Sequence, residues 1–188
     1  MTRMIYYTAS TLDGFLATED HSLDWLLTRD TGEEGGPADY ESFIAGVGAM
    51  VMGASTYRWV LDHAGEGAWE YELPCWVFTH RDDLPVARRG SEPGDIRFTR
   101  ADVREVYAEM AETAGGRDLW MVGGGDLAGQ FADHGLLDEL IVSFAPVTIG
   151  AGKPLLPRHV ELRPVELARS GEFAVARYEV LKENPARL

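Results

Sequence analysis

The segment 120–131 reads WMVGGGDLAGQF and decides how the chain can fold. Its first three residues are apolar and typical of a buried strand, and its last residues begin a helix. Between them lie three consecutive glycines, Gly123 to Gly125. Glycine lets a phosphate group approach the backbone closely, and a helix N-terminus offers unpaired N–H groups. The segment therefore predicts a strand–turn–helix unit, which either binds a phosphate or is only a tight turn.

The same residues fit the GxGxxA pattern of a Rossmann fold, but their context does not. That pattern opens the first strand–helix–strand unit, whereas here it lies two-thirds of the way along the chain. An acidic residue should also end the next strand, where it would hold the ribose hydroxyls. The next apolar run, 141–146, contains no carboxylate. A Rossmann domain is therefore disfavoured.

Apolar runs on both sides of the glycine turn predict further strands. Helical spacing of apolar residues predicts helices after Asp39 and over 55–63, 102–114 and 126–134. The tail 162–181 alternates polar and apolar residues around Ser170 and Gly171, as a hairpin does. We therefore expect an α/β fold, one domain over residues 1–188, with a mostly parallel sheet and an antiparallel C-terminal hairpin. The other predicted strands are 4–10, 49–53, 75–79, 96–98, 119–122 and 140–147.

Composition limits the classes of partner. The chain has 31 Asp plus Glu against 17 Lys plus Arg, a net charge of −14. Such a surface repels nucleic-acid phosphates and anionic lipids, so neither nucleic acid nor membrane is an expected partner. The single cysteine, Cys75, excludes an internal disulfide, and the scattered histidines predict no metal site. No signal-peptide pattern is evident, so we expect a cytoplasmic protein.

Five motifs occur in a fixed order along the chain. They are STLDGFLA at 10–17, VMGASTY at 51–57, VFTHR at 77–81, VGGG at 122–125 followed by Gln130 and Phe131, and APVTIGAG at 145–152. Together they resemble the dihydrofolate reductase-like fold, and in particular stand-alone proteins similar to the C-terminal reductase domain of the riboflavin-biosynthesis enzyme RibD. The resemblance covers nearly the whole chain and implies three layers, with helices on both faces of the sheet.

The resemblance implies an NADPH site built from several loops. Thr79 and Arg81 fall where the family holds the 2′-phosphate, and a hydroxyl with a guanidinium suits a phosphate dianion. The alternative for Arg81 is a solvated loop charge beside Asp82 and Asp83. The other implied cofactor residues are Ala9 and Leu16 at the nicotinamide, Gly53, Ser55 and Thr56 at the phosphates, and Gly123, Gly124, Gly125 and Leu127 at the pyrophosphate.

Two positions depart from the family pattern. Many relatives carry arginine after the glycine of the second motif, where this chain has Ala54. Asp126 stands where a basic residue would help a phosphate, although an acid suits a helix N-terminus. The arginine missing at 54 removes one phosphate contact, which leaves the cofactor affinity and the preference for NADPH over NADH open.

The resemblance also implies a substrate pocket. Asp39 matches the pocket carboxylate of dihydrofolate reductases, Phe43 the aromatic that stacks on the substrate ring, and Trp25 the pocket tryptophan. Such a carboxylate accepts ring N–H donors and assists proton delivery, but Asp39 also suits a plain helix N-terminus. Asp13 is a second candidate acid, and its alternative role is turn formation with Gly14.

The expected activity is that of an NADPH-dependent reductase, with hydride transfer to a pyrimidine, a ribosylamino group or a related heterocycle. In RibD-type reductases the substrate is 5-amino-6-(5-phosphoribosylamino)uracil, which needs a basic site for its phosphate. Two alternatives remain open: a dihydrofolate or pterin reductase, and a non-catalytic nucleotide-binding protein. By analogy with relatives we expect a homodimer. Candidates for the phosphate site are Arg29, Arg58, Lys153 and Arg158.

Overall fold

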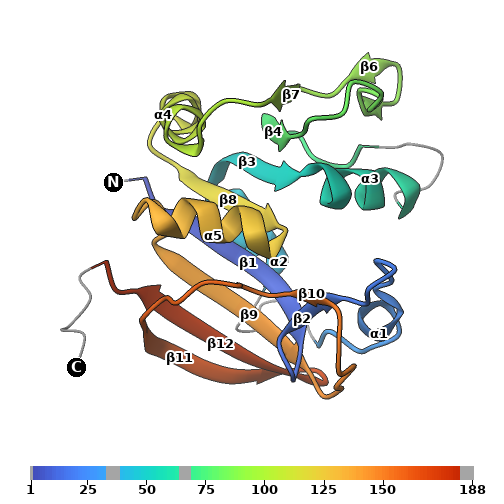
Figure 1. The fold of residues 1–188 in the computed structure, drawn as a ribbon, viewed down its shortest axis with the longest axis vertical. Helices are drawn as coiled ribbons and strands as arrows, with labels where there is room; N and C mark the ends of the chain where they lie inside the picture. Colours follow the sequence, from blue (N-terminus) through green and yellow to red (C-terminus); the bar gives the residue numbers. More distant parts are fainter. Residues whose placement is uncertain (1, 33–38, 64–68, 183–188) are drawn as a thin grey trace.

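The protein is built around one eight-stranded sheet (Figure 1), seen in a computed structural model that describes residues 2–32, 39–63 and 69–182. Six neighbouring strands run parallel, and the last two form an antiparallel hairpin at one edge. This confirms the predicted sheet. In spatial order the strands are β11 (Leu162–Ser170), β12 (Phe173–Val180), β9 (Glu139–Ala145), β1 (Met4–Thr11), β8 (Asp118–Gly123), β3 (Val47–Gly53), β4 (Cys75–Phe78) and β7 (Ile96–Thr99).

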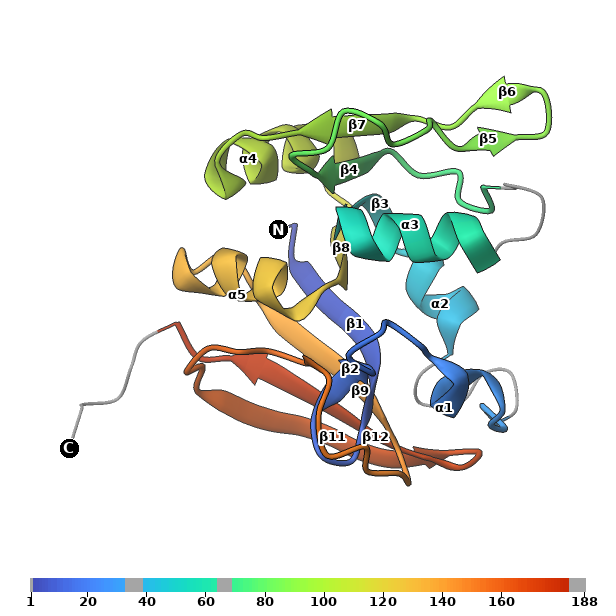
Figure 2. The same ribbon diagram turned by 45° about the vertical axis from the view of Figure 1, so that its right-hand side comes forward.

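Helices cover both faces of the parallel strands, which gives the three layers that were expected (Figure 2). On one face lie α4 (Val103–Ala114) and α5 (Gly125–Asp133), and on the other α2 (Tyr40–Ala45) and α3 (Ala54–His63). The side chains of β1 alternate between the two faces of the sheet and so pack against both helical layers. Met4 and Tyr6 are fully buried under α4 and α5, whereas Tyr7 packs against the cluster beneath α2 and α3.

Some boundaries and short elements differ from the prediction. Tyr40, Phe43, Ile44 and Val47 share a helical spacing, but the helix ends at Ala45 and Val47 already belongs to β3. The strand predicted to reach Val147 ends at Ala145, just before Pro146. Some elements of two to four residues carry no readable periodicity and were not predicted. They are α1 (Asp24–Leu27), β2 (Phe15–Ala17) paired with β10 (Lys153–Pro154), and β5 (Arg88–Arg89) paired with β6 (Glu92–Pro93).

The parallel arrangement decides where a ligand site can lie. The carboxyl ends of six strands meet at one edge of the sheet, and in open α/β sheets ligands bind in the crevice outside that edge. Most of the predicted cofactor residues lie at the carboxyl ends of β3 and β8 or in the segments that directly follow β3, β4 and β8. No helix in the described part of the chain has the length and apolar character needed to cross a membrane.

Candidate active site

A cleft of about 570 Å³ opens at the carboxyl ends of β3, β4 and β7, beside α3, α4 and α5. It brings together predicted cofactor residues from three separate loops, namely Gly53, Ser55, Thr79, Arg81 and Leu127. Thr56, in the first turn of α3, faces the glycine turn: a Cβ built on Gly123 would lie 3.5 Å from its Oγ1. Ala9 and Leu16 lie outside this cleft, on β1 and β2.

The three glycines of the turn have different physical roles. Gly123 has φ +149°, a conformation that favours glycine. Gly125 is packed so tightly that a Cβ would lie 2.1 Å from the carbonyl oxygen of Pro154. Gly124 has ordinary extended angles (φ −87°, ψ −177°), and a Cβ there would meet nothing within 4 Å. The φ and ψ angles and the packing at 124 therefore admit a side chain, although the Gly123–Gly124 peptide bond is cis, and the backbone at the N-terminus of α5 faces open space.

Two arginines enter the cleft from neighbouring strand ends. The backbone N–H of Arg81 donates to Thr79 Oγ1 (2.9 Å), and its exposed guanidinium forms no ion pair with any residue that the structure describes. Arg100 follows β7 and donates to the His80 carbonyl oxygen (3.2 Å). It also pairs with Asp82, so this neighbouring acid does not occupy Arg81.

Arg100 was not among the predicted site residues. It reaches the cleft because β4 and β7 pair in parallel, with Phe78 opposite Thr99 and the Thr79 N–H donating to the Thr99 carbonyl oxygen (3.1 Å). The sequence predicts both strands, at 75–79 and 96–98, but it does not predict that they pair. Only this pairing places Arg100 beside Thr79.

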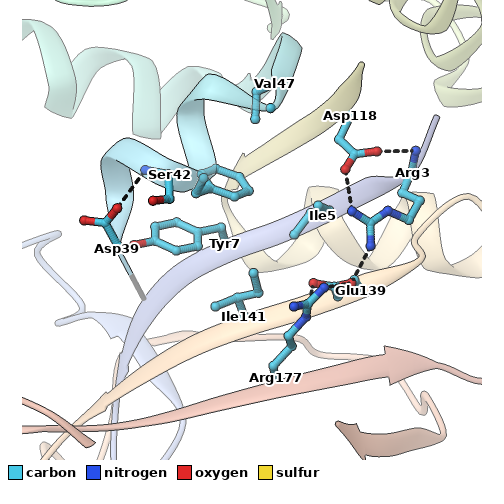
Figure 3. Close-up of a pocket in the computed structure, with 12 residues that line it drawn as sticks. Arg3, Ile5, Tyr7, Asp39, Ser42, Val47, Asp118, Glu139, Ile141 and Arg177 are labelled. Carbon is cyan, nitrogen blue, oxygen red and sulfur yellow. Dashed lines mark hydrogen bonds and ion pairs between the residues drawn. The ribbon is translucent and has the colours of Figure 1, made fainter. Parts of the chain in front are cut away.

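A second cavity, of about 330 Å³, lies between α2 and the sheet (Figure 3). Asp39 and Phe43 both line this cavity, and both have intramolecular roles. Asp39 caps α2 by accepting the Ser42 N–H (2.8 Å), and Phe43 stacks on Tyr7 with centroids 4.4 Å apart. Burial, and secondly the Asp39 charge, raises the pKa of Tyr7, which the sequence did not single out. The phenol of Tyr7 therefore stays protonated at neutral pH beside Asp39.

The far end of this cavity is closed by ion pairs. Figure 3 shows Arg3, Asp118, Glu139 and Arg177 meeting away from Asp39 and Tyr7. Arg3 bridges Asp118 (2.5 Å) and Glu139 (3.0 Å), and Arg177 Nε lies 2.7 Å from Glu139 Oε1. Two cations and two anions compensate one another, so this end has no net charge with which to attract an ion.

Trp25 lies on α1 and is 9% exposed. It packs in a cluster that includes Ala9, a predicted neighbour of the nicotinamide. Its indole N–H is buried and has no hydrogen-bond partner among the described residues. A buried donor left unpaired costs about 1–3 kcal/mol, so an acceptor from a bound molecule or water fits this position. Trp25 lines neither of the two cavities.

Asp13 follows β1 and is saturated with hydrogen bonds. Its carboxylate accepts from Thr11 Oγ1 (2.6 Å) and from the backbone N–H groups of Ile149 (3.1 Å) and Gly150 (2.7 Å). The Thr11 hydroxyl and these amides hold the pKa of Asp13 below its ordinary value. Such a carboxylate stays ionised and is a poor proton donor. The geometry favours a positioning role over the catalytic role considered from the sequence, because Asp13 ties the turn after β1 to the loop after β9.

Replacing Asp13 with asparagine is expected to lower the melting temperature at neutral pH, because an amide accepts these bonds less strongly. The folded-state pKa is depressed, so the stabilisation is complete above the unfolded value of 3.8 and is lost as the pH falls through the folded value. The difference in melting temperature between wild type and Asp13→Asn should therefore shrink below pH 3.8. Thermal unfolding across this range checks it, and a difference independent of pH would contradict the assignment.

Known proteins share this architecture. A Shewanella sp. PV-4 protein, provisionally named as a riboflavin biosynthesis protein, superposes with a TM-score of 0.77 at 21% identity, over 96% of this chain and 99% of that one. Dihydrofolate reductase from Enterococcus faecalis, solved with NADP(H), superposes with a TM-score of 0.55 at 15% identity, over 95% and 96% of the two chains. The dihydrofolate reductase-like fold expected from the motifs is thereby confirmed.

Relatives found by sequence include a protein of similar length and a riboflavin biosynthesis protein. YwjB of Bacillus subtilis, a protein described as uncharacterized, is 28% identical over 174 residues, which are 93% of this chain and 94% of YwjB. The riboflavin biosynthesis protein RibD of Corynebacterium ammoniagenes is 31% identical over 153 residues, 79% of this chain but only 44% of RibD. The model of the RibD C-terminal domain matches residues 3–175. The chain therefore belongs to the RibD C-terminal domain family.

Proposed function

We propose that the protein is a reductase that takes its hydride from NADPH and transfers it to a pyrimidine that carries a ribosylamino group. The observation that carries this proposal is the cleft at the carboxyl edge of the sheet. There the Arg81 guanidinium, which forms no ion pair with the described residues, lies with Thr79 and Arg100. Two cationic groups and a hydroxyl at adjacent strand ends suit a phosphate dianion. NADPH carries such a group on its adenosine ribose, and NADH does not.

The rest of the dinucleotide fits the same edge. The N-termini of α3 and α5 adjoin the cleft, with Ser55 and Thr56 in the first turn of α3 and Gly124 at the start of α5. Free N–H groups at both helix starts suit the pyrophosphate, and the open space above Gly124 admits it. Bound NADPH supplies the hydride from its nicotinamide ring, and the chain's own residues bind and orient it.

The substrate proposal rests on the family and on the face of the sheet beneath α2. The relative from Corynebacterium ammoniagenes is a riboflavin biosynthesis protein. On this chain Asp39 and Phe43, which line the cavity beneath α2, supply an acceptor and an aromatic wall for a polar heterocycle. We assign the protonation role to Asp39 rather than to Asp13, whose lone pairs are already used.

Lys153 is the best placed of the four candidates for a substrate phosphate. It lies in β10, opposite Ala17 of β2 and so beside Leu16, and it pairs with no acid in the part of the chain that the structure describes. The other three are occupied: Arg29 by Glu172, Arg58 by Asp62, and Arg158 by Asp126 and Asp133.

Titration of wild type with NADPH and NADH, with Arg81→Ala and Arg100→Ala as variants, tests the proposal. A charge-assisted hydrogen bond contributes about 1.5–3 kcal/mol. Arg81→Ala should therefore raise the NADPH Kd about 10- to 100-fold, and Arg100→Ala somewhat less because Asp82 shares its charge. NADH affinity should stay within about twofold of wild type. Arg88→Ala, an exposed arginine on β5, is the matched control.

The reaction itself is followed by the loss of NADPH absorbance with 5-amino-6-(5-phosphoribosylamino)uracil, and with dihydrofolate for comparison. Consumption with the ribosylamino compound supports the proposed substrate. NADPH consumption with dihydrofolate alone would instead identify the protein as a dihydrofolate or pterin reductase. If NADPH and NADH bind equally, or if neither binds, the cofactor assignment is wrong.

A further inference from the structure

The cofactor cleft contains acids as well as the two arginines. Asp126 and Asp133 both lie on α5, and their residues line the cleft beside Leu127. In a chain of net charge −14, these two carboxylates would repel an anionic dinucleotide at short range if nothing compensated them. The structure contains a group that removes this repulsion.

Arg158, in the segment between β10 and β11, reaches across to α5. Its Nη2 donates to Asp126 Oδ1 (3.0 Å), its Nε to Asp133 Oδ2 (2.9 Å), and its Nη1 to the Pro157 carbonyl oxygen (2.8 Å). Asp126 also accepts from Gln130 Nε2 (3.0 Å). Gln130 and secondly Arg158 lower the pKa of Asp126, so the pair is ionic across the neutral range. One guanidinium thus serves both acids.

Helix α5 is shaped to receive this side chain. Residue 129 is glycine, although glycine is among the poorest residues for a helix interior. A Cβ on Gly129 would lie 2.7 Å from Arg158 Cγ and 3.2 Å from its Nε. The missing side chain therefore makes the groove that seats Arg158 between the two acids. Arg158 itself does not line the cleft, so it acts through Asp126 and Asp133.

We propose that Arg158 is a positioning residue for the nucleotide: by neutralising Asp126 and Asp133 it makes the α5 side of the cleft acceptable to an anionic dinucleotide. The inference rests on the proposed function. It also explains how an acid is tolerated at 126, where a basic residue would help to bind a phosphate. The same segment holds the glycine turn, since the carbonyl oxygens of Pro154 and Leu155 pack against Gly125.

The test is a set of NADPH titrations at low salt. Arg158→Ala should raise the Kd about tenfold, because two nearby charges become uncompensated. Adding Asp126→Asn and Asp133→Asn to Arg158→Ala should restore the Kd to within about threefold of wild type. Arg158→Lys, which keeps the charge, should also stay within about threefold. In 1 M salt, where the screening length is about 3 Å, the effect of Arg158→Ala should largely vanish.

A purely structural role for Arg158 would give a defect that salt and removal of the acids do not repair, and that result overturns the inference. If Arg158→Ala does not fold, the inference is tested with the double variant Asp126→Asn/Asp133→Asn, in which Arg158 is intact. It should bind NADPH several-fold more tightly than wild type, and an unchanged Kd overturns the inference. Wild type that fails to bind NADPH overturns the proposed function and this inference together, whereas normal wild-type binding with an unaffected Arg158→Ala overturns only the inference.

Discussion

Gly124→Val is expected to abolish NADPH binding while the fold stays intact. A Cβ at 124 meets nothing within 4 Å, and the backbone angles there are ones that valine adopts. The substitution therefore fills only the open space at the start of α5, which the pyrophosphate should occupy. Loss of two charge-assisted hydrogen bonds costs about 3 kcal/mol or more, so the Kd should rise at least about 100-fold.

Calorimetric titration with NADPH measures this loss, and thermal unfolding without cofactor shows whether the fold is retained. Valine is a poorer helix cap than glycine, so a small drop in melting temperature is expected. Gly124→Ala places a smaller group at the same point and should give an intermediate Kd. Unchanged NADPH affinity in the valine variant would remove the glycine turn from the cofactor site.

The sequence predicted the central parallel strands well because they are largely apolar runs covered on both faces, unlike the edge strand β7. The residues from Val47 to Met52, for example, are all nearly inaccessible to solvent. It did not predict β2 and β10, which are two or three residues long and exist because Lys153 and Ala17 are brought together by the rest of the fold. Local periodicity carries no information about such tertiary pairings.

The same limit applied to the site. Thr79 and Arg81 stand together in one motif and were found from it, whereas Arg100 lies beside them only through the register of β4 and β7. Asp13 was considered as an acid because its motif is local. Its hydrogen bonds to Ile149 and Gly150, which come from a distant loop, were not visible in the sequence. Residue type and spacing identified the candidates, and long-range contacts determined their roles.

The three adjacent glycines show most clearly that long-range contacts determine roles which residue type does not reveal. Gly125→Ala tests this point. Alanine is the better helix former by about 1 kcal/mol, so propensity alone predicts stabilisation at this first position of α5. The structure predicts the opposite, because the new Cβ would lie 2.1 Å from the Pro154 carbonyl oxygen and 2.4 Å from that of Leu155. Both contacts are to backbone, which cannot rotate away as a side chain does.

Overpacking of this kind costs about 1–3 kcal/mol and occasionally more. With a clash this close we expect a loss at the upper end, about 3 kcal/mol, which lowers the melting temperature of a chain of this size by roughly 6–12 °C. Thermal unfolding of Gly125→Ala beside Gly124→Ala measures the contrast, since the neighbouring alanine meets no atom within 4 Å. If Gly125→Ala melts at or above the wild-type temperature, the segment after β10 does not hold the glycine turn as described. The expected result is a loss of stability in Gly125→Ala. It would show that the fold requires glycine at 125, whereas the ligand requires it at 124.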